Sequence, residues 1–195
     1  MGAGIAYTLA ALPEAEAPRL LVLAQGSAEE ALARARLRAA LADDPRDGSL
    51  AVREAAADAL ASLRSLQALW PGTSAGARHL EARLAGEAAS VKTTGADTRV
   101  PIRNPEVRGP LEVYYYDHVA ASLAARGAAA EPAPDATSLS GDAELLAYEA
   151  LNLADGRRSV SEIRDILTGR YAPVPVAFLS ARFDRLARAG IVSWK

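Results

Sequence analysis

The part of the sequence that most restricts the fold is its last third, about residues 142–195, where nearly every junction carries a helix-boundary signal. An apolar stretch from Leu145 to Leu153 is followed by Gly156, and glycine ends a helix well because it takes the left-handed backbone conformation without a Cβ clash. Ser159 and Glu162 have the spacing of a capping box, in which each side chain accepts a hydrogen bond from an otherwise unpaired backbone N–H. The pattern therefore predicts one helix before Gly156 and a second that begins at Ser159.

The remainder of this stretch predicts a third helix and a short strand. Pro173 and Pro175 prevent the second helix from continuing, and the apolar stripe after them ends at Gly190. The run Ile191–Trp194 is rich in residues that favour β-strands. Three helices followed by a strand is the order of a small winged-helix module, and we expect that fold for residues 142–195.

Composition favours helices in the rest of the chain. Half of the 195 residues are hydrophobic, mostly alanine and leucine, whereas aromatic residues make up only 5%. This balance suits helices that pack closely through small side chains, so we expect a mainly α protein. Lysine and arginine number 22 against 24 acidic residues, and this near-neutral charge gives no general reason to expect nucleic acid or an anionic membrane as a partner.

The chain divides into four predicted parts. Apolar periodicity predicts a helical bundle over residues 1–91, with helices over residues 1–12, from Ser27 to about Leu41 with Ser27 as its cap, over residues 50–70 and over residues 74–89. Residues 92–123 have no period and contain three consecutive tyrosines, which indicates an extended connector with a Tyr-rich element. Residues 124–141 are rich in alanine and proline and are predicted to form a flexible linker before the module of residues 142–195.

The sequence supports neither export nor a membrane span. The N-terminal apolar run is short and has no basic region before it, and no later segment approaches the ~20 apolar residues that a spanning helix needs. The chain has no cysteine, which excludes disulfides and thiolate zinc sites and is compatible with the cytoplasm. We therefore expect a cytoplasmic protein without a membrane partner.

No combination of residues predicts a catalytic or metal site. The two histidines, His79 and His118, do not belong to a cluster with metal-ligand spacing, and a catalytic zinc needs about three converging ligands. Glu29 and Glu30 are adjacent acids at a predicted helix start, with arginines as neighbours, so a solvated helix face explains them. We expect no catalytic residue, no metal ligand and no cofactor in this chain.

Several residues are candidates for binding, and each also has a structural explanation. Tyr115 and its two neighbours could stack on a flat ligand or could anchor the connector, and Trp194 lies in the predicted strand. Arginines flank the second helix and line the third, where a DNA-binding winged helix would enter the groove, although the same pattern is that of a solvated helix face. The candidate binding arginines are Arg157, Arg158, Arg182 and Arg185, with Arg188 one turn further along.

Two motifs resemble the carboxy-terminal region of bacterial zinc aminopeptidases, the aminopeptidase Y and glutamate carboxypeptidase-like family. One is the element from Arg103 to Leu111 with its Gly-Pro-Leu ending, and the other is the signature from Glu149 to Arg164, which contains Asp-Gly-Arg-Arg-Ser-Val. The run Ala172–Pro175 also matches. The core of the signature is similar, in addition, to winged-helix peptide-recognition domains of peptide-modification pathways.

The resemblance implies a role without catalysis. The zinc-binding His-x-Asp element and Glu-Glu pair of those peptidases have no counterpart here, so no site residue carries over and zinc is implied only on a catalytic partner or a missing domain. We therefore expect an accessory or oligomerisation portion of a zinc aminopeptidase-like protein, which contacts a catalytic peptidase domain or a second copy of itself. The alternatives are a free-standing module that binds an extended peptide by strand addition beside Ile191–Trp194, and a DNA-binding regulator.

Overall fold

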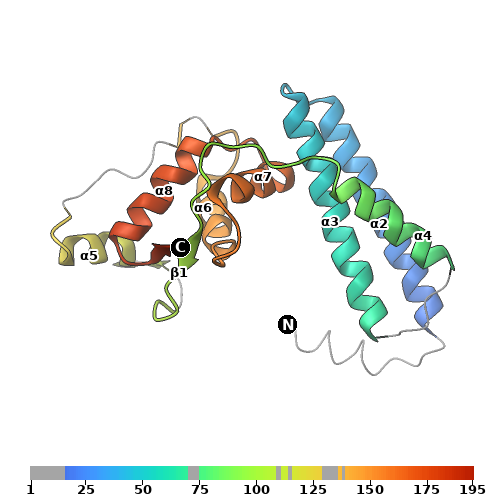
Figure 1. The fold of residues 1–195 in the computed structure, drawn as a ribbon, viewed down its shortest axis with the longest axis horizontal. Coiled ribbons are helices and arrows are strands. Elements are labelled where there is room, and N and C mark those ends of the chain that lie inside the picture. Colours follow the sequence, from blue (N-terminus) through green and yellow to red (C-terminus); the bar gives the residue numbers. More distant parts are fainter. Residues whose placement is uncertain (1–15, 70–74, 109–110, 114–115, 129–135, 138) are drawn as a thin grey trace. The chain divides into compact units, whose positions relative to one another are not determined.

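The computed structural model describes residues 16–69, 75–108, 111–113, 116–128, 136–137 and 139–195 (Figure 1). In these residues the protein is mainly α, with seven helices and two antiparallel sheets of two strands each. The chain forms two compact units, Met1–Lys92 and Thr93–Lys195, and each is described by itself. The predicted helix over residues 1–12 lies outside the described residues.

The first unit is a bundle of three helices, α2 (Ala17–Ala40), α3 (Pro45–Leu69) and α4 (Ala75–Ala88), of which α3 packs against both of the others (Figure 1). A short connection at Asp43-Asp44 reverses the chain, and Pro45 starts α3, where its fixed φ suits the first helical turn and its missing N–H is not needed. The core is built mostly from leucine and alanine, which lets the helices approach closely. Its buried members are Ala28, Leu32, Ala56, Leu60, Leu63, Leu80 and Leu84.

Ion pairs connect the helices of this unit at its surface. Arg83 of α4 pairs with Glu29 of α2, and Arg36 of α2 pairs with Glu87 of α4 at 2.7 Å. Such exposed pairs contribute roughly 0–1 kcal/mol each, so the leucine core holds the bundle together.

The start of α2 differs from the prediction. The helix begins at Ala17, with a proline in its first turn, so Ser27 lies in the middle of the helix and does not cap it. Within the run Leu20–Leu23, whose type is ambiguous in the sequence, Leu21 packs against the same core as Ala28 and Leu32, and this packing outweighs the local capping signal. Glu29 and Glu30 therefore belong to the middle of a helix.

The second unit contains α6 (Ala143–Asn152), α7 (Val160–Arg170) and α8 (Val176–Arg188), followed by β4 (Val192–Trp194). The capping box of Ser159 and Glu162 is complete, and Gly190 follows the end of α8, as predicted. Gly156 is left-handed with a φ of 75°, but α6 already ends at Asn152 with Leu153 as its C-cap, so Gly156 belongs to the turn after the helix rather than to its end. Asp142 caps α6 through hydrogen bonds from two backbone N–H groups. Local turn chemistry thus sets the ends of all three helices.

The segment predicted as an extended connector is part of the second unit. Within it, β1 (Pro101–Arg103) pairs antiparallel with β4, with Ile102 opposite Ser193. The other edge of β1 lies against the turn between α6 and α7, where the Arg103 N–H donates to Ala154 O at 2.9 Å and the Gly156 N–H donates to Pro101 O at 3.1 Å. The segment is extended as predicted, but its backbone groups are paired within the unit because a buried strand edge needs hydrogen-bond partners.

The remainder of residues 93–141 also joins the second unit. β2 (Glu112–Val113) pairs with β3 (Tyr116–Asp117), and α5 (His118–Ala125) places Val119 and Leu123 in the core. Of the predicted Ala/Pro-rich linker, Ala128, Ala136 and Leu139 lie against the same core. A few apolar side chains are enough to hold a segment that composition alone marks as a linker.

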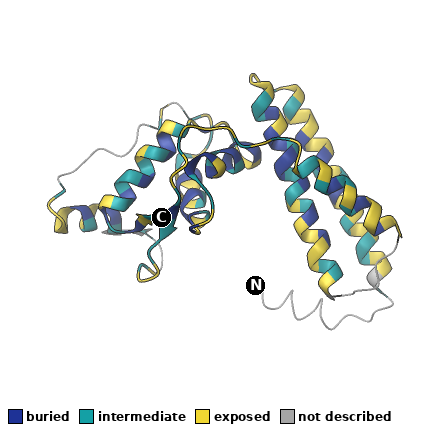
Figure 2. Ribbon diagram, viewed as in Figure 1, coloured by how far each residue is buried: buried dark blue, intermediate teal, exposed yellow. Residues whose placement is uncertain are grey.

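The core of the second unit lies between α5, α6, α7, α8 and the β1–β4 sheet, and Figure 2 shows the buried sides of these helices. Phe183 is fully buried, and its ring meets that of Trp194 edge-on, with centroids 6.2 Å apart. Three residues of the predicted apolar faces lie outside this core: Leu145, Tyr148 and Tyr171 are exposed. The period places α6 and α7 correctly but overstates how much of each helix is covered.

We predict that Phe183→Ala destabilises the second unit by about 3–5 kcal/mol, because the change removes a fully buried ring and leaves a cavity beside Trp194. The measurement is urea denaturation followed through the NMR amide signals of α7 and α8. Tyr148→Ala is the control, since that side chain is 63% exposed and should change the stability by less than about 0.5 kcal/mol. Equal stability of the two variants would contradict the assignment of this core.

We also predict that the same substitution has opposite effects at two glycines. Gly156→Ala should destabilise by about 1–2 kcal/mol, because the backbone is left-handed there and a Cβ would lie 3.0 Å from Cγ1 of Ile102. Gly86→Ala should stabilise by about 0.5–1 kcal/mol, because this exposed glycine in α4 has no atom within 4 Å of the new Cβ. Thermal unfolding of the two variants checks both signs, and a stabilised Gly156→Ala would refute the turn.

Candidate functional site

A polar cluster of the second unit surrounds Arg99, just before β1. Its guanidinium donates to Asp97 Oδ2 and to Asp184 Oδ1, each at 2.6 Å, and lies 4.3 Å from the ring centroid of Trp194. Asp184 belongs to α8 and Trp194 to β4. One arginine therefore joins the extended segment, a helix and a strand.

The electrostatics of this cluster favour its charged forms. Hydrogen bonds from the Arg99 side chain are the main reason that the pKa of the Asp97 carboxyl falls from 3.8 to about 2, although partial burial opposes the change. The Ser180 hydroxyl adds a 2.6 Å hydrogen bond to Asp97 Oδ2. The pKa of Arg99 is raised in turn, first by Asp97 and then by Asp184. These contacts join the extended segment to α8, through Ser180 and Asp184, and to β4, through Trp194.

Backbone hydrogen bonds anchor the same segment to the start of α7. The Ser161 N–H donates to Asp97 O at 3.1 Å, and the Val160 N–H donates to Arg99 O at 3.0 Å. These two donors belong to the first turn of α7, where no intrahelical acceptor exists. The extended segment therefore completes the capping of the helix as well as the sheet.

Arg157 and Arg158 lie in the turn between α6 and α7, where Asp155 organises the backbone. The N–H groups of both arginines donate to Asp155 Oδ1, and the Arg158 guanidinium donates to Oδ2 at 2.6 Å. Burial alone would raise the pKa of Asp155, but these backbone hydrogen bonds outweigh it and lower the pKa. Arg158 is thus used in the turn, whereas the side chain of Arg157 is exposed.

The candidate arginines of α8 do not form an exposed basic row. Arg182 and Arg185 are half-buried, Arg188 is exposed, and Asp184 between them pairs with Arg99. A helix that enters a DNA groove presents several side chains to bases and phosphates. The arrangement of α8 offers little support for the DNA-binding hypothesis.

Of the other candidates, Trp194 is brought into the Arg99 cluster, and Tyr115 lies outside the described residues. Sequence reasoning missed Asp97, Arg99, Ser180 and Asp184, because their contacts join distant parts of the chain. A weak signal was present: Val100 and Ile102 are β-branched residues flanked by Arg99 and Arg103, although Pro101 between them is typical of an edge strand at most.

One edge of β4 is occupied by the chain itself. The Asn104 N–H donates to Ile191 O at 2.9 Å and the Lys195 N–H donates to Val100 O at 3.0 Å, and Ser193 lies opposite Ile102. Ile191, Ser193 and Lys195 therefore face the segment that contains β1. In an antiparallel pair, the main-chain groups of the residues between, here Val192 and Trp194, point to the opposite edge. No strand pairs there among the described residues, and Val192 is buried while Trp194 is half-buried.

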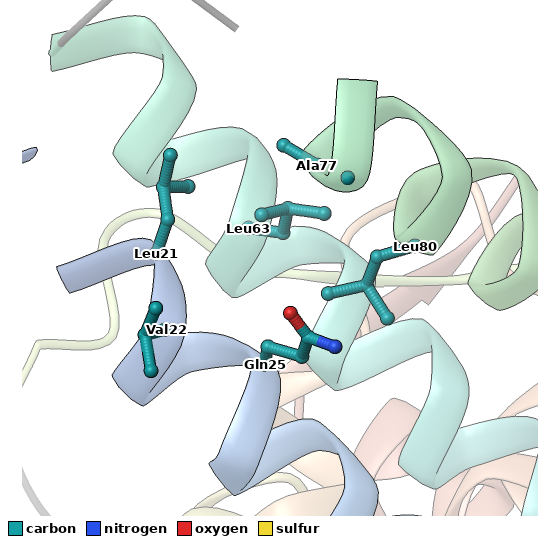
Figure 3. A pocket seen from close by; sticks show the side chains of 7 residues that line it. Leu21, Val22, Gln25, Leu63, Ala77 and Leu80 are labelled. Carbon is teal, nitrogen blue, oxygen red and sulfur yellow. The ribbon is translucent and has the colours of Figure 1, made fainter. Parts of the chain in front are cut away.

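A small pocket lies in the first unit between α2, α3 and α4 (Figure 3). Its volume is about 80 Å³, and Gln25 is the polar side chain among the residues that line it. Sites for cofactors and substrates usually have about 300–1,000 Å³, so this pocket has room only for a few small molecules such as water. The lining residues are Leu21, Val22, Gln25, Leu63, Gly76, Ala77 and Leu80.

The described residues contain no group of three or more His, Asp or Glu side chains that could hold a metal ion. Nε2 of His118 lies 3.4 Å from Oγ of Ser122 on the same helix, and His79 is exposed on α4. No helix in the described ranges is long and apolar enough to cross a membrane.

Comparisons of the chain with models of protein families, with curated proteins and with solved structures find no match. The resemblance to zinc aminopeptidases stays a prediction that rests on the quoted motifs.

We predict that Asp97→Asn destabilises the second unit at neutral pH by about 1–2 kcal/mol and that this difference disappears in acid. The contribution of Asp97 is fully present above its unfolded pKa of 3.8, and it is lost as the pH falls towards the folded value of about 2. The measurement is the free energy of unfolding of both proteins between pH 7 and pH 2. A difference that stays constant over this range would mean that the Asp97 carboxylate does not stabilise the unit.

Proposed function

We propose that this chain is the non-catalytic accessory portion of a zinc aminopeptidase-like protein, with a C-terminal unit of the winged-helix type. In this role it contacts a catalytic peptidase domain or a second copy of itself. It supplies no metal ligand, and the zinc of the assembled protein lies on the catalytic part.

The observation that carries the proposal is how the signature residues are used. Asp155 organises the turn, Gly156 takes its left-handed conformation, and Ser159 and Glu162 cap α7. Val160 and Ile163 are fully buried. The segment shared with the peptidases thus builds a turn and a helix start, which supports a common fold without common chemistry.

The first unit supports an interaction role. Val22, Leu23 and Leu37 of α2, and Leu41 at its C-terminal cap, are exposed and lie outside the leucine core of the bundle. Large apolar side chains gathered on one element mark contact surfaces more often than single ones do.

A module that binds an extended peptide is the alternative, and the outer edge of β4 favours it. β1 occupies one edge of β4, so an added strand would pair at the opposite edge, with the main-chain groups of Val192 and Trp194. The buried state of Val192 means that side chains must move aside before a peptide pairs along the whole strand.

The deciding experiment is affinity capture of the tagged chain from its native extract, with a zinc assay, a peptidase assay and mass spectrometry on the eluate. We expect zinc and aminopeptidase activity to elute with the chain in fixed ratio. A metal-free eluate without peptidase activity would refute the accessory role, and recovery of a short peptide in that eluate would favour the alternative.

A further inference from the structure

The side of α2 that faces away from its own bundle carries a regular row of residues. Ala28, Leu32 and Ala35 are buried and mark the inner side of the helix. At 3.6 residues per turn, the opposite side is occupied by residues spaced three or four apart. In order, these are Arg19, Leu23, Gly26, Glu30, Arg34, Leu37 and Leu41.

Between Leu23 and Leu41, this outer row has apolar ends and a charged middle. Leu23 is 65% exposed, Leu37 63% and Leu41 76%, and Figure 2 shows exposed residues along this unit's helices. Between these leucines, Glu30 and Arg34 form an ion pair on the helix surface. A partner that covers the row must therefore meet apolar groups at two ends and satisfy both charges in the centre.

Four members of the row are arranged symmetrically about Leu32. Leu23 and Leu41 are equally far from this residue along the helix, and Glu30 and Arg34 are too. A two-fold axis at the level of Leu32, perpendicular to α2, therefore places Leu23 opposite Leu41 of a second copy, about 13 Å either side of the centre. The same axis places Glu30 opposite Arg34 of the other copy, and does so twice.

Gly26 fits the same arrangement. Glycine weakens a helix interior, and no described residue outside the helix's own backbone lies within 4 Å of where its Cβ would be, so no packing among the described residues requires it. Under the two-fold axis, Leu37 of the second copy lies at the level of Ser27, next to Gly26, where the missing side chain leaves space. A parallel pairing would instead bring Glu30 against Glu30 and Arg34 against Arg34.

We infer that the outer row of α2 binds the same row of a second copy of this chain, with the two helices antiparallel. The inference rests on the proposed function, because it names the partner for self-association. Burial of the leucine ends supplies the attraction, and the two Glu30–Arg34 pairs between the copies set the direction and the level of the helices.

The first experiment is sedimentation equilibrium of the purified full chain between about 1 and 100 µM. We expect a dimer whose dissociation constant lies in this range. Leu23→Ser combined with Leu41→Ser should leave a folded monomer, because both side chains are exposed in the single chain. Circular dichroism of this variant checks that the helices persist.

The second experiment separates contacts between copies from contacts within one helix. Glu30→Arg and Arg34→Glu should each weaken the homodimer roughly tenfold, since each sets like charges against each other at two places. An equimolar mixture of the two variants should form a heterodimer at least as tight as the wild-type dimer. The matched control is Glu81→Arg with Arg64→Glu, an exposed ion pair between α3 and α4 that should not alter association.

A wild-type chain that stays monomeric at about 100 µM would overturn the inference, as would a dimer that the α2 variants leave unchanged or a mixture that forms no heterodimer. The proposed function fails separately. A dimer without any associated zinc peptidase would refute the accessory role and keep the α2 pairing, and a monomer that recovers the peptidase would do the reverse.

Discussion

The second unit depends on the hydrogen bonds that hold one extended segment, Asp97–Asn104, in its middle. On one side the segment pairs with the α6–α7 turn and the first turn of α7, and on the other side with β4. Without it, several buried backbone groups would lack partners, at about 1–3 kcal/mol for each. Arg99 adds side-chain contacts to α8 and β4 at the same place, so the segment links the α6–α7 turn, α7, α8 and β4.

The sequence predicts local structure here much better than long-range pairing. The helix boundaries at Ser159 and Gly190 follow from residues within one turn of each and are confirmed, whereas α6 ends at Asn152, ahead of the left-handed Gly156. Ser27 fails because burial of a continuous stripe outweighs one capping signal. The pairing of β1 with β4 has no local signal beyond two β-branched residues, Val100 and Ile102, and composition therefore marks residues 92–123 only as a connector.

The candidate site shows the same division. Sequence patterns identify which residues carry charge, but the partner of each charge is set by the fold. Arg158 pairs with Asp155 in the α6–α7 turn, and Arg99, which no pattern singled out, pairs with both Asp97 and Asp184. The motif from Glu149 to Arg164 is recognisable because a turn and a capping box require particular residues, and that requirement is independent of any reaction.

The two units also differ in the order in which their contacts become available. In the first unit, each helix packs against its neighbour in the sequence, and such local topologies fold quickly. The sheet of the second unit joins Pro101 to Trp194, so it closes only when nearly the whole unit has been synthesised. A nascent chain therefore passes through a stage in which the first bundle is complete while the edge of β1 still lacks β4 and is open to pairing with other unfinished chains.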